Sequence, residues 1–249
     1  MIPIESNLNY DLKLVSEWLK SNRLYLNVGK TKLLIFRSQK KKIPLNSISI
    51  KIQGVKIKPS THVKYLGVFI DENLSWNTHI KELSNKLSRA NGIISKLRYY
   101  APKSSILSVY YAIFYSHIVY GCPVWSLTSK GNIDTINILQ KKCVRLMNFA
   151  PYNSHTITLF ADNEILKLED IITANKLKLG FDFKTNSLPE DLLNMFQFSC
   201  DVHKHKTRSV ANDGLFVPSV KSTTYGINTL KYSVPVTWNS FSMLNPPSL

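Results

Sequence analysis

Residues 22–36 read Asn22-Arg23-Leu24-Tyr25-Leu26-Asn27-Val28-Gly29-Lys30-Thr31-Lys32-Leu33-Leu34-Ile35-Phe36, and residues 63–71 read Val63-Lys64-Tyr65-Leu66-Gly67-Val68-Phe69-Ile70-Asp71. The first segment is a basic turn followed by an apolar run over residues 32–37, which predicts a strand buried on both faces. Residues 48–58 alternate between apolar and polar side chains around Gln53-Gly54, which predicts a hairpin. The second segment predicts a further single strand over residues 63–70. Together these strands predict a small antiparallel sheet.

Amphipathic helices are predicted on both sides of this stretch. Upstream, residues 7–21 place leucine and valine side chains three and four positions apart, so we expect a helix that packs on the strands. Downstream, residues 76–97 repeat this spacing over about six turns. The basic positions of this second helix, and one just beyond it, are Lys81, Lys86, Arg89, Lys96 and Arg98. One face of the helix should therefore pack, and another should be cationic.

The second half of the chain predicts a helical bundle and an irregular tail. Residues 106–120 are apolar almost all round, as expected for the central helix of a bundle. Further helices are predicted over residues 134–147, 165–181 and 189–196, with irregular structure and short strands from residue 203 onward. The predicted fold class is α+β, with a small sheet and one helix over residues 1–72, a helical bundle over 73–150, and a partly helical, loosely ordered extension over 151–249.

The composition points to a polyanionic partner. The chain has 249 residues, 44% of them hydrophobic, so it can form a core. Lysine and arginine number 32 against 16 acidic residues, and the resulting formal charge of +16 attracts nucleic acid. A basic protein without a specific partner is the alternative reading.

Cysteine usage and the first residues bear on the compartment. Cys122, Cys143 and Cys200 are far apart and odd in number, so we expect no disulfide framework. The first residues lack the basic start and apolar run of a secretion signal, so we predict an intracellular protein of the cytoplasm or nucleus, not a secreted one. Residues 104–125 are uncharged and about as long as a membrane span. Their tyrosines and the Gly121-Cys122-Pro123 break favour a buried helix over a membrane or structural role, so no membrane partner is expected.

Several short motifs follow Trp18 in a defined order. They are Leu26-Asn27-Val28-Gly29-Lys30-Thr31, Tyr65-Leu66-Gly67-Val68-Phe69-Ile70-Asp71, Trp76-Asn77-Thr78-His79-Ile80, Tyr120-Gly121-Cys122-Pro123-Val124-Trp125, Gln140-Lys141-Lys142 with Arg145, Thr207-Arg208 and Trp238-Asn239. Each is weak alone, but their order across nearly the whole chain resembles the reverse transcriptases of non-LTR retrotransposons, of the jockey-like or LINE type. The resemblance implies a palm remnant over residues 1–72, a thumb over 73–150 and a C-terminal extension.

The resemblance also implies a pair of Mg²⁺ ions in the complete enzyme, held by one aspartate and an Asp-Asp pair. In the family both elements precede the motif at residues 26–31, and this sequence contains no Asp-Asp pair. We therefore expect no metal or other cofactor in this chain. Phe160-Ala161-Asp162-Asn163 resembles the family's aspartate hairpin, but it follows the thumb and lacks the second carboxylate, so an ordinary loop is favoured.

A zinc site and a set of nucleic-acid contacts are the remaining candidates. Cys200, His203 and His205 could begin a zinc site, but no second half follows, and chance clustering is favoured. By resemblance, Lys30 matches a polymerase lysine near the nucleotide phosphates, a candidate phosphate contact or general acid, with a solvated loop lysine as the alternative. The candidate nucleic-acid contacts form two groups. The first is Lys30, Lys32, Tyr65, Leu66 and Gly67, of which residues 65–67 match, by resemblance, the hairpin that grips the primer end. The second group would contact the phosphate backbone and consists of Lys81, Lys86, Arg89, Lys96 and Arg98.

The predicted function is that of a C-terminal fragment of an RNA-directed DNA polymerase. We expect it to be inactive alone and to retain template–primer binding. One alternative is a nucleic-acid-binding module with no enzymology. Another is an incomplete gene model of a complete, active reverse transcriptase. The sequence therefore leaves open whether the chain is an enzyme and which protein partners it has.

Overall fold

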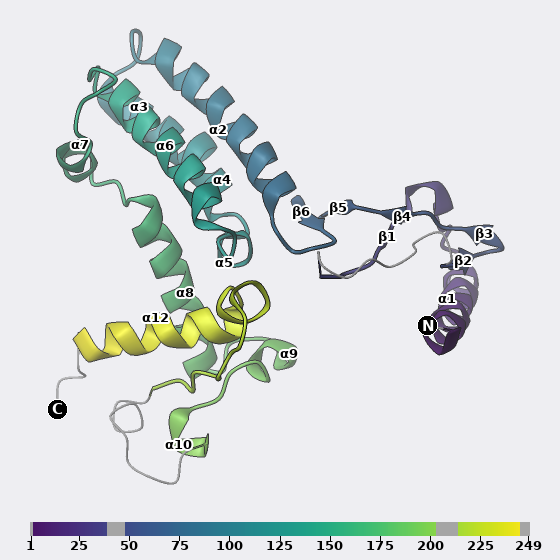
Figure 1. Cartoon of the computed structure of the whole chain (residues 1–249). Coiled ribbons are helices and arrows are strands. Elements are labelled where there is room, and N and C mark those ends of the chain that lie inside the picture. Colours follow the sequence, from purple (N-terminus) through teal and green to yellow (C-terminus); the bar gives the residue numbers. More distant parts are fainter. Residues whose placement is uncertain (1, 39–47, 203–213, 245–249) are drawn as a thin grey trace. The chain divides into compact units, whose positions relative to one another are not determined.

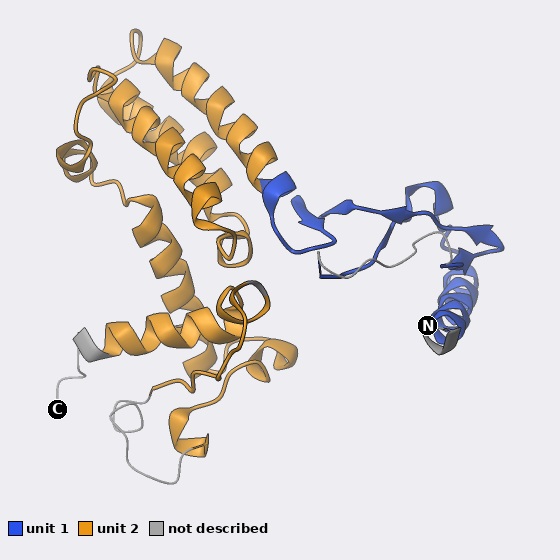
Figure 2. Cartoon of the chain, viewed as in Figure 1, with its two compact units in different colours: residues 1–79 blue, residues 80–249 orange. Residues whose placement is uncertain are grey.

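The computed structural model describes residues 2–38, 48–202 and 214–244. It combines many helices with a few short strands, which confirms the mixed helix-and-strand composition predicted from the sequence (Figure 1). The chain forms two compact units, Met1–His79 and Ile80–Leu249, divided within one helix (Figure 2). The predicted division at residues 72 and 150 remains a prediction.

The described residues of the first unit form one long helix and three strand pairs. Its elements are α1 (Ile2–Ser21), the 3₁₀ turn η1 (Val28–Lys30), β1 (Leu33–Leu34), β2 (Lys51–Ile52), β3 (Val55–Lys56), β4 (Pro59–Ser60), β5 (His62–Tyr65) and β6 (Val68–Asp71). Strands β1 and β4 pair in parallel, whereas β2–β3 and β5–β6 are antiparallel hairpins. A bidentate pair joins Arg37 to Glu72, with 3.0 and 2.9 Å between donor and acceptor atoms, and ties the chain after β1 to the end of β6.

The structure corrects several strand predictions. The hairpin around Gln53-Gly54 is confirmed, but the single strand over 63–70 is wrong, because the chain reverses at Leu66-Gly67. Both turn residues have positive φ, 45° and 84°, as a two-residue type I′ turn requires. The three pairs do not form one antiparallel sheet. The strand predicted over 32–37 shortens to two half-buried residues, and Phe36 is 58% exposed rather than buried.

Helix α1 covers the predicted segment and begins five residues earlier. Its packing on the strands is confirmed in part: the Asn9 side chain accepts a hydrogen bond from the Lys51 N–H (2.8 Å) and donates one to the Ser49 carbonyl (3.0 Å). Its apolar stripe is covered only in part: Leu8, Leu12 and Leu19 are half-buried, whereas Val15 and Trp18 are 50% and 60% exposed.

The second unit is helical. It contains most of α2 (Asn77–Leu97), then α3 (Lys103–Val109), a π-helical turn η3 (Tyr110–Tyr115), α4 (Ser116–Val119), α5 (Cys122–Trp125), α6 (Lys130–Met147), α7 (Ile157–Asp162), α8 (Leu168–Lys184), α9 (Glu190–Leu193), α10 (Ser199–Val202), the π turn η4 (Thr223–Ile227) and α12 (Leu230–Leu244). The continuous helix α3–η3–α4 confirms the helix predicted over 106–120, and Tyr110, Phe114 and Ile118 are fully buried on one face. Its burial on all sides is wrong, because Tyr111 and Tyr120 are 40% and 56% exposed. Within the described residues, every helix is too short or too polar to span a bilayer.

The predicted irregular tail is wrong over residues 230–244, which form α12. This helix packs against α8, with Val234 in a core that also contains Phe183, Phe196 and Leu215. Of the short strands predicted in this tail, the described residues from 214 to 244 contain one isolated bridge, between Leu215 and Phe198. The remainder of the predicted tail, residues 203–213 and 245–249, lies outside the described residues.

Candidate nucleic-acid interface

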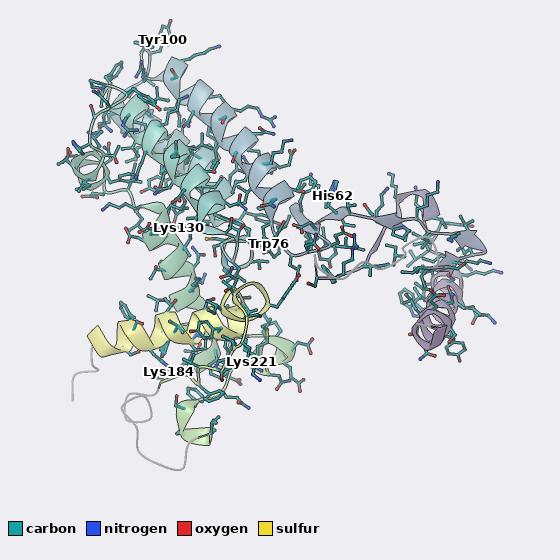
Figure 3. All side chains as sticks on the ribbon, viewed as in Figure 1. His62, Trp76, Tyr100, Lys130, Lys184 and Lys221 are labelled. Atoms are coloured by element: carbon teal, nitrogen blue, oxygen red, sulfur yellow. The ribbon has the colours of Figure 1, made fainter. Side chains whose placement is uncertain are left out.

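The junction between β6 and α2 is built around the buried carboxylate of Asp71. Its oxygens accept hydrogen bonds from the backbone N–H groups of Asn73 (3.1 Å), Ser75 (3.0 Å) and Trp76 (2.8 Å), and from the Ser75 hydroxyl (3.1 Å). Trp76, labelled in Figure 3, is buried beside this carboxylate just before α2. Asp71 therefore fixes the start of α2 and is not available as a metal ligand.

One face of α2 is packed into the second unit. Leu87 and Ile94 are fully buried on this face. The Asn91 side chain donates to the Leu139 carbonyl of α6 (3.1 Å), which sets the register between the two helices. The rotation of α2 about its axis is thus determined by the core, and the orientation of its opposite face follows from it.

The opposite face carries three exposed cations, Lys81, Arg89 and Lys96, which we call the α2 cationic face. At a rise of about 1.5 Å per residue they lie roughly 10–12 Å apart along the helix axis. Glu82 is the helix's single acidic residue. Arg89 is held locally by a hydrogen bond to the Asn85 carbonyl (3.3 Å). The face is therefore a row of positive charge along one helix.

Lys86 and Arg98, also predicted as contacts, lie elsewhere. Lys86 is half-buried at the edge of the row. The pKa of the His117 imidazole is lowered mainly by burial and, to a smaller extent, by the positive charge of Lys86. Arg98 donates to the Leu146 carbonyl (3.1 Å) and to the Tyr99 hydroxyl (2.7 Å), and its guanidinium lies over the Tyr99 and Phe149 rings. These contacts of the Arg98 guanidinium link the end of α2 to the end of α6.

The other predicted contacts belong to the first unit. Lys30 ends η1, which the Asn27 side chain caps by accepting the Lys30 N–H (3.1 Å), and both Lys30 and Lys32 are exposed. Tyr65 and Leu66 are 63% and 73% exposed at the β5–β6 turn. The predicted set thus divides between the two units, with Lys30, Lys32 and the turn in the first and the α2 residues in the second.

The described residues do not fit a Mg²⁺ site. Across residues 2–38, 48–202 and 214–244, no three His, Cys, Asp or Glu side chains cluster closely enough to hold an ion. Asp162 ends α7, and the Asn163 amide beside it donates to the Asn148 side chain (3.1 Å), which is the arrangement of a structural loop. Cys200 is exposed, while His203 and His205 lie outside the described residues.

Comparison with known proteins gives the family context. The chain is 24% identical over 198 residues to the RNA-directed DNA polymerase from mobile element jockey of Drosophila melanogaster, covering 75% of this chain and 20% of that protein. It is 25% identical over 161 residues to the probable RNA-directed DNA polymerase from transposon X-element of the same species, covering 63% and 17%. The chain is related to the reverse transcriptases of jockey-like mobile elements.

Other comparisons define the extent of this relationship. A Pol polyprotein from the type-1 retrotransposable element R1 of Bradysia coprophila is 28% identical over 149 residues, covering 57% of this chain and 14% of that protein. The chain spans about a fifth or less of the length of these relatives. No family model and no solved structure matches it. The resemblance to non-LTR reverse transcriptases is thus confirmed.

Proposed function

We propose that this chain is the late palm, thumb and C-terminal part of a non-LTR reverse transcriptase, and that it binds the template–primer duplex through the α2 cationic face. The observation that carries the proposal is the row formed by Lys81, Arg89 and Lys96 on a helix whose opposite face is fixed in the core. Ammonium and guanidinium groups on a rigid helix suit the phosphate backbone, which carries no sequence information. The relationship to RNA-directed DNA polymerases supports a duplex as the ligand.

We propose further that the chain alone does not extend a primer. Support comes from the sequence, which contains no Asp-Asp pair to bind the metal ions of the reaction. Lys30, Lys32 and the turn at Tyr65-Leu66-Gly67 remain predicted contacts to the nucleotide and primer. An intracellular location also remains a prediction, supported by the three free cysteines.

The binding proposal is tested by removing the charge of the row. The variant K81Q/R89Q/K96Q loses three phosphate contacts. The plot of log affinity for a duplex against log salt concentration should therefore become less steep, its slope decreasing in magnitude by about 2 to 3. Affinity for an RNA–DNA primer–template is measured by fluorescence anisotropy at several salt concentrations. Circular dichroism checks that the helices are retained.

The matched control removes the same total charge elsewhere in the second unit. Lys167, Lys178 and Lys221 are exposed, and K167Q/K178Q/K221Q should leave the salt slope nearly unchanged. An equal loss in both triple variants would mean that only net charge matters and would reject the α2 face as the site. Primer extension by the unaltered chain with Mg²⁺ or Mn²⁺ would reject the proposed inactivity.

A further inference from the structure

The first unit contains a groove that the proposed duplex interface does not use. Its cavity volume is about 1160 Å³, and it is lined by α1, by the chain after α1 and by the β2–β3 hairpin. The charged side chains along it are Lys13, Lys20, Arg23 and Lys51, with Glu17 as the one acid. This volume exceeds that of most small-molecule pockets, so an extended ligand suits it better.

The walls of the groove are held by backbone and amide hydrogen bonds. At the end of α1, the Leu24 N–H donates to the Leu19 carbonyl (2.8 Å) and the Arg23 N–H to the Lys20 carbonyl (3.0 Å). This is the Schellman arrangement, which turns the chain back beside its own helix. Across the groove, the Asn9 amide bonds described above hold β2 against α1.

Arg23 occupies the position of this motif where glycine is preferred. Its φ is 57°, in the left-handed region that side chains with a Cβ rarely adopt. Phe149, Glu164 and Asn186 adopt the same conformation after α6, α7 and α8, so this helix end recurs in the chain. This turn fixes the backbone of Arg23 at the edge of the groove, which its side chain lines.

The charge of the groove is largely unbalanced. Glu17 lies 3.9 Å from Lys13 in an exposed pair within α1. Among the described residues, no carboxylate lies within ion-pair distance of Lys20, Arg23 or Lys51. Three cations that face one groove without acidic partners favour an anionic ligand with several charges.

An aromatic ring completes the arrangement. Tyr25 lines the groove two residues after Arg23, and its side chain is 100% exposed. Sites for single-stranded nucleic acid combine a cationic track for the backbone with exposed rings on which bases stack. We propose that this groove binds a single-stranded segment of nucleic acid, with Lys20, Arg23 and Lys51 along its phosphates and Tyr25 stacked on a base.

The Arg23→Gly substitution separates function from folding. Glycine accepts the left-handed backbone without strain, so the full-length variant should melt at the same temperature as the unaltered chain or higher. It should nevertheless bind a ten-nucleotide single strand more weakly. In K20Q/R23G/K51Q the salt slope for this strand should fall by about 2, since single strands give roughly 0.7 per phosphate contact.

Base stacking has its own variant and probe. Y25L should weaken binding of the single strand roughly 5- to 150-fold, the range measured for loss of one stacked base. It should have no effect on an abasic strand of the same length. K56Q/K58Q, which removes two charges from the first unit outside the groove lining, serves as the control.

These measurements are made in the unaltered chain and in K81Q/R89Q/K96Q, so that a contribution from the α2 face is excluded. The groove losses should persist in that background and should leave duplex affinity unchanged, which keeps this inference separate from the proposed function. Unchanged single-strand affinity in K20Q/R23G/K51Q would overturn the inference. Equal binding of the abasic strand, or equal competition by a polyglutamate peptide of matched charge, would show a nonspecific anion surface and overturn it as well.

Discussion

At the scale of single residues, several side chains in the motifs that resemble non-LTR reverse transcriptases have structural roles. The Asp71 carboxylate holds the loop before α2, and His79 accepts the Phe69 N–H through its Nδ1 atom (3.4 Å). Gln140 is fully buried and donates both to the Tyr110 hydroxyl (3.0 Å) and to the Leu166 carbonyl (2.9 Å). Burial of these polar groups requires particular partners, which accounts for the side chain found at each position.

The Asp71 network gives the first residue-scale prediction. Asp71→Ala leaves buried backbone N–H groups without an acceptor, so the loop and the start of α2 should open more easily, by about 2–4 kcal/mol. Hydrogen exchange of peptides covering residues 68–80 measures this opening. Asp71→Asn keeps one carbonyl acceptor and should lose less. Exchange in the alanine variant at the rate of the unaltered chain would contradict this role.

His117 gives a second prediction, concerned with pH. Desolvation, and then the nearby Lys86 charge, lower the pKa of His117 below its usual value of about 6.5. The unfolded chain therefore binds the proton more readily, and the contribution of neutral His117 to stability is lost as pH falls from above 6.5 through the folded-state pKa.

Substitution of the neighbour tests this electrostatic contact. Lys86→Gln should raise the His117 pKa, measured by NMR titration of the imidazole Cε1–H signal, and Ser88→Gln on the exposed side of α2 should not. A His117 pKa that stays constant in the Lys86 variant would mean that the ammonium does not act on the ring.

At the scale of elements, the long amphipathic helices were predictable and the turn and last helix were not. The spacing of apolar residues in α2 and α6 directly predicts which face is buried. The β5–β6 turn could not be predicted from the sequence, because leucine rarely adopts a positive φ. Leu66 also continues the apolar run of residues 63–70, so the run reads as one strand. Helix α12 was missed because Val234, Pro235 and Val236 are poor helix formers, and its stability comes from packing on α8.

The contact between α8 and α12 gives an element-scale prediction. A Cβ added at Gly180 would lie 2.7 Å from the Trp238 ring, so Gly180→Ala should force the two helices apart despite alanine's better helix propensity. We expect a loss of about 1–3 kcal/mol in the stability of the second unit, measured by urea unfolding. Gly131→Ala in α6, where nothing lies near the added methyl, should be neutral or stabilising. Equal stability of both variants would contradict the close packing.

At the scale of the whole molecule, charge and motif order are readable from the sequence, whereas assembled surfaces are not. The chain has 32 basic and 16 acidic residues, which predicts a polyanionic partner but does not show which surface binds it. Periodicity does locate the α2 cationic face, because that surface lies on one helix. The groove of the first unit joins Lys20 and Arg23 to Lys51, and only the pairing of β2 with α1 brings these distant residues together.

The most direct test of the central claim is a lysine footprint of the complete chain on a primer–template duplex. Exposed amines are acetylated briefly with and without an RNA–DNA duplex at low salt, and modification at each lysine is quantified by mass spectrometry. The account predicts protection of Lys81 and Lys96 by the duplex, with Lys178 and Lys221 modified equally in both samples. Uniform protection of all four lysines, or none at Lys81 and Lys96, would contradict the assignment of the α2 face as the duplex-binding surface.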